Sequence, residues 1–595
     1  MIDLQDPRTR GRLRKAIKTS REALEPFRRV RKELVRDYVG SWYSEGGARN
    51  KTLVNLMNQT ARIYTVALAA HNPQVLVSTP VDENLAFSRR FEVNLNKLIS
   101  DMELDVTFRA VVLDAFFCIG CAVVMMRDTD TRFHGLLESE EDVWLDLGEP
   151  WLNRVSLDDL ILDMTAKELT KMRYCGHRYR ADFEKVQAEP GYDKKVLEKL
   201  TPTSKNTTDN PDFARDIAAG IAVDDDELKS MIWLQDVWVA ENKMVATMAA
   251  DVDLPPLLER QWTGSQAGPY KFLSLGNVPD NIIPASPAVN LKGMHDLQNR
   301  LHRRMEQDSD AHRVVNVYPP SDADDAEQLR KAARNSWKRM NDPKSIQQVE
   351  FGGVDPRDQA LALFIQDEYD RFAGNLAVMG GLGPQSDTVG QEQIISGQVS
   401  RMESDMRMAV VQFASECILD LGRLMWEDQT MYLRSSVPMG NTSIQMSMDW
   451  TPKNRVGNFE DFQFRVEPYS MIFKTPEQKL QELFQVLQQI APLWPMFQAS
   501  GASLNAEAIV DEIARLKNRP EFKRFITFAN PAAMLGGDQN TIRQSPVTSR
   551  ETVRKNIGTG GTKDARSSIM QQVMSGQSKP QVNSQQAKAM TRRPA

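Results

Sequence analysis

The sequence has little of what secreted proteins, membrane proteins and most enzymes require. Only four of its 595 residues are cysteine, which argues against a disulfide framework and indicates a reducing compartment. The longest apolar stretch, Ala110 to Met126, contains Asp114 and is short for a membrane span, so it predicts protein core. Residues 1–14 are polar and rich in arginine, without the apolar segment of a signal peptide.

Catalytic and metal-binding signatures are also missing. The sequence contains no Gly-x-Ser-x-Gly, His-Glu-x-x-His, Walker A or strand-linked dinucleotide motif. Histidine is scarce, with six residues, and His295 and His302 share a helical face without a carboxylate pair beside them. Asp158 and Asp159 form an acid pair, but nothing distinguishes them among eighty acidic residues. We therefore expect no catalytic residue, no metal and no cofactor.

One cysteine pair allows two interpretations. Cys118 and Cys121 form a C-x-x-C pattern, which suits either a redox pair or half of a metal site. No second pair and no nearby histidine accompany it, and its surroundings are fully apolar. These features favour buried thiols.

Charge is distributed unevenly along the chain. Residues 8–36 hold twelve Lys/Arg against three Glu, and residues 529–595 hold ten Lys/Arg against three acids, although the net charge is −6. The body is therefore acidic, which is atypical of a DNA-coating protein. The N-terminal helix expected at 8–40 is either a nucleic-acid arm or a peripheral amphipathic helix with a solvated basic face. Its apolar stripe (Leu13, Ile17, Leu24) favours the second interpretation, because a stripe needs a surface to pack on.

Before residue 285, hydrophobic periodicity predicts a mixture of helices and strands. Helices are expected at 55–70 and 84–117, and strands at 74–79, from Gly120, at 150–180, at 231–250 and at 270–283. The acidic segment 200–227 lacks the ligand spacing of a calcium loop and predicts an exposed loop.

The central third carries the most specific pattern. Two helices, at 288–312 and 356–378, flank a strand–helix–strand insert at 313–318, 326–340 and 346–351. A glycine-rich break at 379–390 follows. It contains no lysine and is not preceded by a clear strand, which argues against a phosphate-binding loop.

Beyond the break, an unbroken apolar stripe predicts a helix at 391–430 that is about 55–60 Å long. Strands at 432–437, 444–448 and 461–467 and helices at 476–499 and 503–517 are expected next. Residues 529–595 contain no Phe, Trp or Tyr, so this tail is expected to be flexible or to order only on assembly.

The order of these parts resembles the portal proteins of tailed bacteriophages, in particular those of short-tailed phages. Four short motifs support the resemblance: Asn72-Pro-Gln-Val-Leu-Val77, Asp114-Ala-Phe-Phe-Cys-Ile-Gly120, Val155-Ser-Leu-Asp-Asp-Leu-Ile-Leu-Asp163 and Thr388-Val-Gly-Gln-Glu392. Leu157 replaces the usual proline of the third motif, and the fourth departs from the family's Thr-Ala-x-Glu. The resemblance implies an α+β, predominantly helical fold with a wing, stem, clip, tunnel loop, long spine helix and helical crown.

The resemblance also implies domain boundaries. The wing would span 1–285, the first stem helix 286–312, the clip 313–352, the second stem helix 353–378 and the tunnel loop 379–390. The spine helix and further wing strands would span 391–474, the crown 475–528 and the tail 529–595.

A portal subunit would form a dodecameric ring at one capsid vertex, as the channel for DNA packaging and ejection and the attachment point for the tail. The implied partners are further copies of the chain, double-stranded DNA, the major capsid protein, the packaging terminase and tail adaptor proteins, with no membrane. The implied location is the virion, after assembly in the host cytoplasm. Two alternatives remain open: a phage DNA-processing enzyme, and another virion structural or scaffolding protein.

Three sets of candidate functional residues follow from this assignment. A DNA channel should repel phosphate, and the second stem helix carries five acids against two arginines. The channel-lining candidates are Asp355, Asp358, Asp367, Glu368 and Asp370. The tunnel-loop candidates are Gln385, Ser386, Asp387, Thr388 and Val389. The candidates for docking the motor or adaptor are Asp322, Asp324, Asp325 and Trp337.

Overall fold

The computed structural model describes most of the first 493 residues and a few positions beyond them. The described residues are 3–40, 54–69, 71–127, 132–134, 144–146, 149–189, 191–202, 230–333, 335–337, 339, 342, 344, 346–374, 376, 389–428, 431–438, 445–467, 470–471, 476–493, 509–510, 513–514 and 517. The chain divides into two compact units, 1–482 and 483–595. The predicted tail and the predicted loop at 200–227 lie almost entirely outside the described residues.

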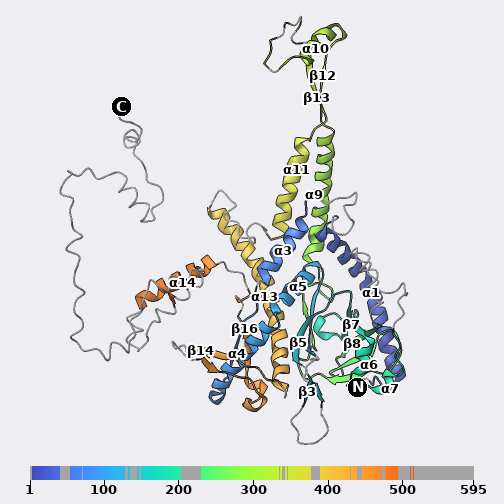
Figure 1. Ribbon diagram of the computed structural model, residues 1–595, viewed down its shortest axis with the longest axis vertical. Helices are drawn as coiled ribbons and strands as arrows, with labels where there is room; N and C mark the ends of the chain where they lie inside the picture. The colour runs from blue at the N-terminus through green and yellow to red at the C-terminus, as the bar shows by residue number, and fades with distance from the viewer. Residues whose placement is uncertain are drawn as a thin grey trace, which may run out of the picture. The chain divides into compact units, whose positions relative to one another are not determined.

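The fold mixes α and β elements, with helix predominating, as the sequence predicts (Figure 1). The helices are α1 (Pro7–Val39), α3 (Leu56–Leu68), α4 (Leu85–Asp101), α5 (Leu104–Phe117), α6 (Phe183–Ala188), α7 (Lys194–Leu197), α9 (Pro287–Asp310), α10 (Ala323–Arg330), α11 (Pro356–Phe372), α13 (Val389–Glu427) and α14 (Pro476–Ile490). The strands are β1 (Val75–Ser78), β2 (Gly120–Arg127), β3 (Arg132–His134), β4 (Trp144–Asp146), β5 (Glu149–Arg154), β6 (Leu160–Leu162), β7 (Tyr174–Asp182), β8 (Met231–Val239), β9 (Met244–Ala249), β10 (Leu258–Gln261), β11 (Tyr270–Leu273), β12 (Arg313–Val317), β13 (Gln347–Phe351), β14 (Ser436–Pro438), β15 (Gln445–Ser447) and β16 (Gln463–Val466). None of the described helices is both long enough and apolar enough to cross a bilayer.

Two antiparallel sheets form the β part of the body. The larger has the strand order β10-β9-β8-β7-β6, and the smaller has the order β11-β2-β5. β2 begins at Gly120, as predicted, because a Cβ there would lie 2.4 Å from the carbonyl oxygen of Val111 in α5. The absence of a side chain therefore lets the strand leave close to the preceding helix.

The helix predicted at 84–117 is two helices. α4 ends at Asp101 and α5 begins at Leu104, because Glu103 adopts a left-handed backbone conformation with φ 49°. A non-glycine residue at positive φ cannot continue a right-handed helix. The apolar periodicity continues across the break, so it carried no signal of the turn.

α1 is a packed amphipathic helix, as the second of the two interpretations predicts, but its basic face is not wholly solvated, because Arg10 and Arg28 are buried. Ile17 and Leu24 are buried against the body. Several arginines that raise the local charge are used inside the protein: Arg28 donates to the Leu157 and Leu160 carbonyls, and Arg31 lies 3.2 Å from Asp114 and from Asp158. These side chains therefore fix α1 to the body.

α13 forms one wall of the main core and carries part of an aromatic cluster. The rings of Phe87, Phe91, Trp426, Trp450, Phe459, Phe462 and Phe464 lie within 4.8–6.5 Å of neighbouring rings in the cluster. Trp450 is fully buried, with its ring centroid 4.8 Å from that of Phe91. The cluster joins α4, α13 and the segment around β16, which are far apart in the sequence.

Replacing Trp450 with alanine is expected to lower the free energy of unfolding by about 3–5 kcal/mol, because the large cavity left behind cannot collapse fully. Urea unfolding followed by far-ultraviolet circular dichroism measures this loss. Tyr432→Ala, at a half-exposed aromatic position (51% exposed), is the matched control and should change stability by less than about 1 kcal/mol. Equal losses in the two variants would contradict the assignment of Trp450 to the core.

A buried ion pair ties α13 to the smaller sheet. Lys271 of β11 lies 2.6 Å from Asp420 of α13, and the two side chains are 2% and 1% exposed. Ser265 completes the pair: its backbone N–H and its hydroxyl both donate to the Asp420 carboxylate, at 2.9 Å each. The Lys271 ammonium also donates to the carbonyl of Gly268 at 2.9 Å. Hydrogen bonds on both partners compensate the cost of removing the charges from water.

α9 and α11 pack side by side as a helical pair, and the β12–α10–β13 segment lies between them in the sequence (Figure 1). The sequence predicts two helices of similar length, each about 35 Å. α9 has 24 residues, about 36 Å, but α11 has only 17, about 26 Å. α11 ends at Phe372 instead of 378 because Gly374 takes a positive φ of 84°. The short helix predicted at 326–340 is α10, which begins earlier and ends at Arg330.

Candidate functional site: the helical pair and its tip

The base of the helical pair is fixed to the body by buried polar contacts. The hydroxyls of Tyr369 in α11 and Thr60 in α3 lie 2.9 Å apart, and Tyr64 donates to the Ala373 carbonyl at 3.2 Å. On the other helix, Lys292 lies 2.8 Å from Asp37 of α1. These contacts set the direction in which α9 and α11 leave the body.

The predicted channel-lining acids do not share one side of α11. Asp355 is the N-cap and accepts from the Arg357 N–H at 2.8 Å. Asp358 turns towards α9, where it lies 3.3 Å from Arg304. These two carboxylates have local roles, as a cap and as an inter-helix partner, which helical spacing alone did not reveal.

The other three predicted acids lie near the base of α11. Asp367 and Asp370, three residues apart, are neighbours on the helix surface. Burial and the nearby Asp367 carboxylate raise the pKa of Asp370. Glu368 lies 3.0 Å from Arg371, which offsets its charge. Within the described residues, no lysine or arginine forms an ion pair with Asp367 or Asp370. The place of these two acids on a channel wall stays a prediction.

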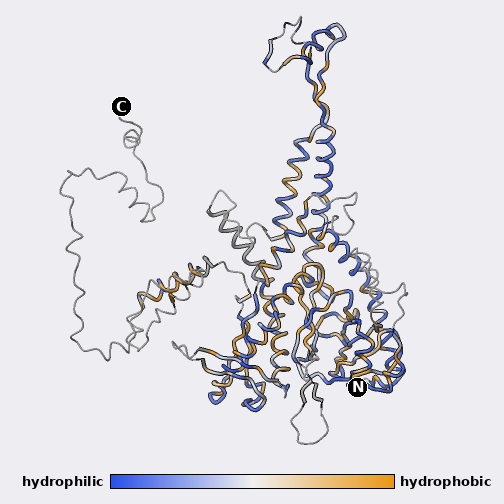
Figure 2. The backbone as a smooth tube through the Cα atoms, viewed as in Figure 1, coloured by the Kyte–Doolittle hydropathy of each residue, from blue (hydrophilic) through white to orange (hydrophobic). Residues whose placement is uncertain are grey.

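α11 has more apolar surface than α9 covers. Ala362 and Ile365 pack on Leu301 of α9 in a small core of the pair. Beside this stripe, Leu361, Phe364 and Phe372 are 43%, 60% and 66% exposed. At about 100° per residue they fall within an arc of roughly 80°, so they form one apolar side of the helix. We call these three residues the outer apolar side of α11; Figure 2 colours the apolar residues of α11 orange.

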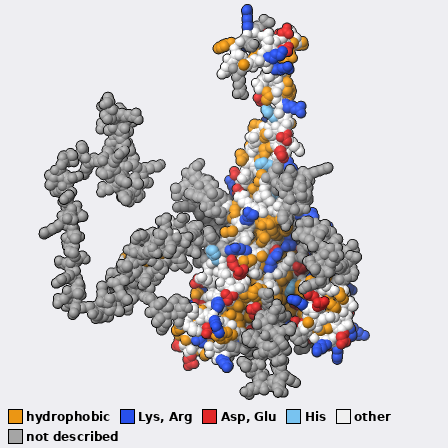
Figure 3. Space-filling model, in the orientation of Figure 1, with side chains coloured by type: hydrophobic (Ala, Val, Ile, Leu, Met, Phe, Trp, Pro, Cys, Tyr) orange, Lys and Arg blue, Asp and Glu red, His pale blue; other side chains and the backbone are white. Residues whose placement is uncertain are grey.

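The tip between α9 and α11 is a two-stranded ribbon with little cover. β12 pairs antiparallel with β13, and almost every side chain of both strands is exposed. Val315 is 42% exposed and Phe351 is 54% exposed. A two-stranded ribbon is marginal by itself, and apolar side chains on it favour association with another surface (Figure 3).

The predicted docking residues lie at this tip. Asp324 and Asp325 are in the first turn of α10, and Asp322 directly precedes it, an arrangement that the helix dipole favours. Trp337 follows α10 and is 99% exposed. A fully exposed tryptophan suits a protein-binding surface. The docking role of these four residues remains a prediction.

The predicted tunnel-loop residues Gln385, Ser386, Asp387 and Thr388 lie outside the described residues. Val389, which was predicted to belong to the loop, is the first residue of α13. Gly390 does not delay the helix, because one glycine costs only about 1 kcal/mol against a helix of 39 residues.

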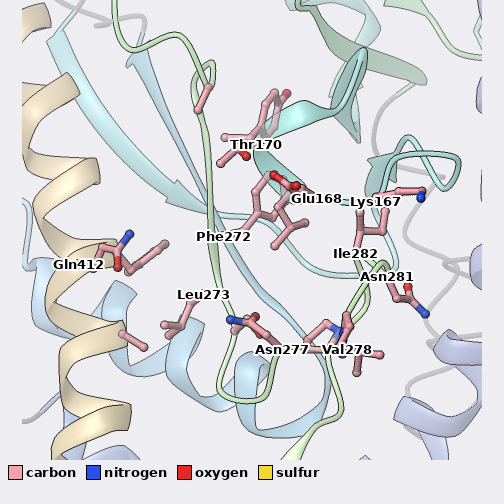
Figure 4. Close-up of a pocket in the computed structure, with 18 of the residues that line it drawn as sticks. Lys167, Glu168, Thr170, Phe272, Leu273, Asn277, Val278, Asn281, Ile282 and Gln412 are labelled. Atoms are coloured by element: carbon pink, nitrogen blue, oxygen red, sulfur yellow. The ribbon is translucent and has the colours of Figure 1, made fainter.

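A pocket of about 470 Å³ lies between α13, β11 and the segments at 167–170 and 277–284 (Figure 4). Glu168, Thr170 and Phe272 lie together in the middle of the view, and Gln412 of α13 approaches from the opposite side. The described residues that line the pocket include no histidine or cysteine. It therefore offers no nucleophile–base pair of the Ser-His or Cys-His kind.

Cys118 and Cys121 are buried thiols, as predicted. All four are free and buried, and burial raises the pKa of Cys118 to about 11. A thiol with a raised pKa stays protonated and is a poor nucleophile and a poor metal ligand. Among the residues that the structure describes, no cluster of His, Cys, Asp or Glu could hold a metal ion.

Sequence reasoning missed the Lys271–Asp420 pair. A weak signal was present, because each is a single charge within an apolar segment: Lys271 lies between Tyr270 and Phe272, and Asp420 lies beside Leu419 and Leu421. A lone charge in such a setting is almost never fully buried without a partner. The sequence did not reveal which residue that partner was.

No protein-family model and no curated protein matches the sequence. Among solved structures, the chain is similar to one in the neck of an empty gene transfer agent particle computed with C6 symmetry, with 11% identity, a TM-score of 0.30, and coverage of 82% of this chain and 94% of that one. A second match, from the virion of a native gene transfer agent particle, has 11% identity, a TM-score of 0.27 and the same coverage. Likenesses at these values do not identify a function.

Proposed function

We propose that this chain is a portal subunit of a tailed-phage-type particle. About twelve copies form a closed ring at one capsid vertex. Double-stranded DNA passes through the ring during packaging and ejection, and the tail attaches to it. The coarser form of the proposal is a structural protein of the particle that acts without catalysis.

The observation that carries the proposal is the outer apolar side of α11. Leu361, Phe364 and Phe372, which lie on one side of α11, stay exposed in a single copy. A neighbouring copy that places its own helix pair against this side removes the apolar surface from water. A contact between two different faces, repeated around a rotation axis, closes into a ring.

The remaining features fit the same assembly. The exposed β12–β13 ribbon and the acidic start of α10 lie at the end of the helix pair, a suitable place for the packaging motor or tail adaptor to dock. Asp367 and Asp370 then face the channel, where negative charge repels DNA phosphates and lets the duplex slide. The 39-residue α13, joined to β11 by the buried ion pair, serves as the spine of each subunit.

The purified full-length protein is expected to form rings with a central hole in negative-stain electron micrographs. Twelve copies of the 67.4 kDa chain give a particle of about 0.8 MDa by mass photometry. Incubation with magnesium and plasmid DNA, the test for a DNA-processing enzyme, should leave the DNA intact. Monodisperse monomers, or filaments without a hole, would overturn the proposal, and so would magnesium-dependent cleavage that co-purifies with the protein.

A further inference from the structure

A second pocket, of about 460 Å³, lies between the two sheets of the body. One wall is the face of the larger sheet that carries His177, Tyr179 and Asp236, and the facing wall includes Met125 of β2. Trp262, which follows β10, also lines it. We call this space the inter-sheet pocket. Its volume lies in the range of small-molecule sites, and its mostly apolar lining with a few polar groups is typical of them.

A hydrogen-bond network fixes the orientation of His177. The Tyr270 hydroxyl donates to the Asp236 carbonyl at 3.1 Å, and it lies 2.8 Å from Nδ1 of His177. A hydroxyl has only one hydrogen, so the contact with His177 requires Nδ1–H to donate. The Asp236 carboxylate is occupied as well, because it accepts from Thr247 at 2.7 Å and from Tyr179 at 3.3 Å.

This arrangement leaves one unused acceptor. Burial lowers the pKa of His177, so the ring is neutral, and with hydrogen on Nδ1 it carries a lone pair on Nε2. No donor within the described part of the chain reaches Nε2. The ring lines the pocket, keeps some accessible surface and stacks on Tyr179, with centroids 5.3 Å apart.

We propose that the inter-sheet pocket binds a small planar aromatic molecule that carries an O–H or N–H donor. The donor bonds to Nε2 of His177. The ring of the ligand lies among the Tyr179 and Trp262 side chains and the thioether of Met125, surfaces that favour aromatic groups. This site does not depend on the proposed function, since every residue that forms it belongs to one copy of the chain.

The test uses two probes, 4-fluorophenol and 4-fluoroanisole, in which one O-methyl group replaces the hydroxyl hydrogen and so removes the donor. Their binding to the full-length protein is followed by the broadening of the ligand ¹⁹F signal. We expect 4-fluorophenol to bind at least about tenfold more tightly, because the methyl ether cannot donate to Nε2. Equal affinities, or no binding of the phenol, would overturn the proposal.

His177→Phe keeps a flat ring and removes the acceptor, so it should abolish the preference for the phenol. His302→Phe, a matched change on α9 far from the pocket in the fold, should leave both affinities unchanged. If His177→Phe fails to fold in a thermal unfolding test, Met125→Trp tests the site instead, since the larger side chain fills the pocket from the facing wall. Loss of phenol binding in Met125→Trp supports the site, and retained binding refutes it. A folded His177→Phe variant that still prefers 4-fluorophenol to 4-fluoroanisole also refutes the proposal.

Discussion

Replacing Lys271 with methionine is expected to lower the free energy of unfolding by about 3–5 kcal/mol, because it leaves the Asp420 carboxylate buried without a counter-charge. The pair lies where the side chains are almost inaccessible to water, at 2% and 1% exposed. The ammonium contacts the Asp420 carboxylate, the Ser265 hydroxyl and the Gly268 carbonyl. Of these, the carboxylate loses most, since a charge in the protein interior has no water to replace its partner.

Equilibrium urea unfolding at a fixed protein concentration measures the loss, since assembly contributes to the apparent stability. Lys171→Met is the matched control: its partner Glu168 is 2.8 Å away, but both side chains are largely exposed, at 70% and 55%, so the change should cost less than about 1 kcal/mol.

The double variant Lys271→Met/Asp420→Leu distinguishes the loss of the ion pair itself from the cost of leaving the Asp420 carboxylate buried and unpaired. Well-packed apolar replacements of a buried ion pair are often neutral, so the double variant should recover most of the stability that the single variant loses. A single variant that stays within 1 kcal/mol of the native protein would mean that α13 is not held to β11 by this pair.

Replacing Phe364 with glutamate is expected to prevent ring assembly while leaving each subunit folded. The side chain is 60% exposed in one copy, so its loss removes little from the core. In the proposed ring, however, it is buried against the neighbouring helix pair, where a carboxylate without a partner costs about 2 kcal/mol or more at every interface. Because the penalty recurs around the ring, the concentration needed for assembly should rise by well over tenfold.

Mass photometry over a dilution series measures that concentration, and circular dichroism checks the fold. Gln366→Glu adds the same charge at an exposed position of α11 outside the outer apolar side, so it should assemble like the native protein. The double variant Phe364→Glu/Phe372→Glu should need a still higher protein concentration to assemble into rings. Rings that form at unchanged concentration in the double variant would show that this side of α11 is not an interface.

Much of the secondary structure was predictable because it depends on local patterns. The apolar stripe of α13 and the helix–strand–helix order around β12 follow from periodicity, which a single segment already contains. The apolar surroundings of Cys118 and Cys121 likewise predicted buried thiols, and the structure confirms them. Element ends were less accurate, because the left-handed turn at Glu103 and the positive φ at Gly374 depend on packing and not on periodicity.

The sequence by itself determined the fold class, the order of the helices and strands from α9 to α13, and the contrast between basic ends and an acidic middle. Tertiary structure alone decided what individual charges do. Asp358 faces Arg304, Arg31 of a basic helix joins Asp114, and Lys271 finds Asp420 almost 150 positions away. A charge takes its role from the partner and the burial that folding gives it. Neither is written in the local pattern, which is why the five acids of α11 divided into a cap, an inter-helix partner, a member of an ion pair within the helix and one neighbouring pair.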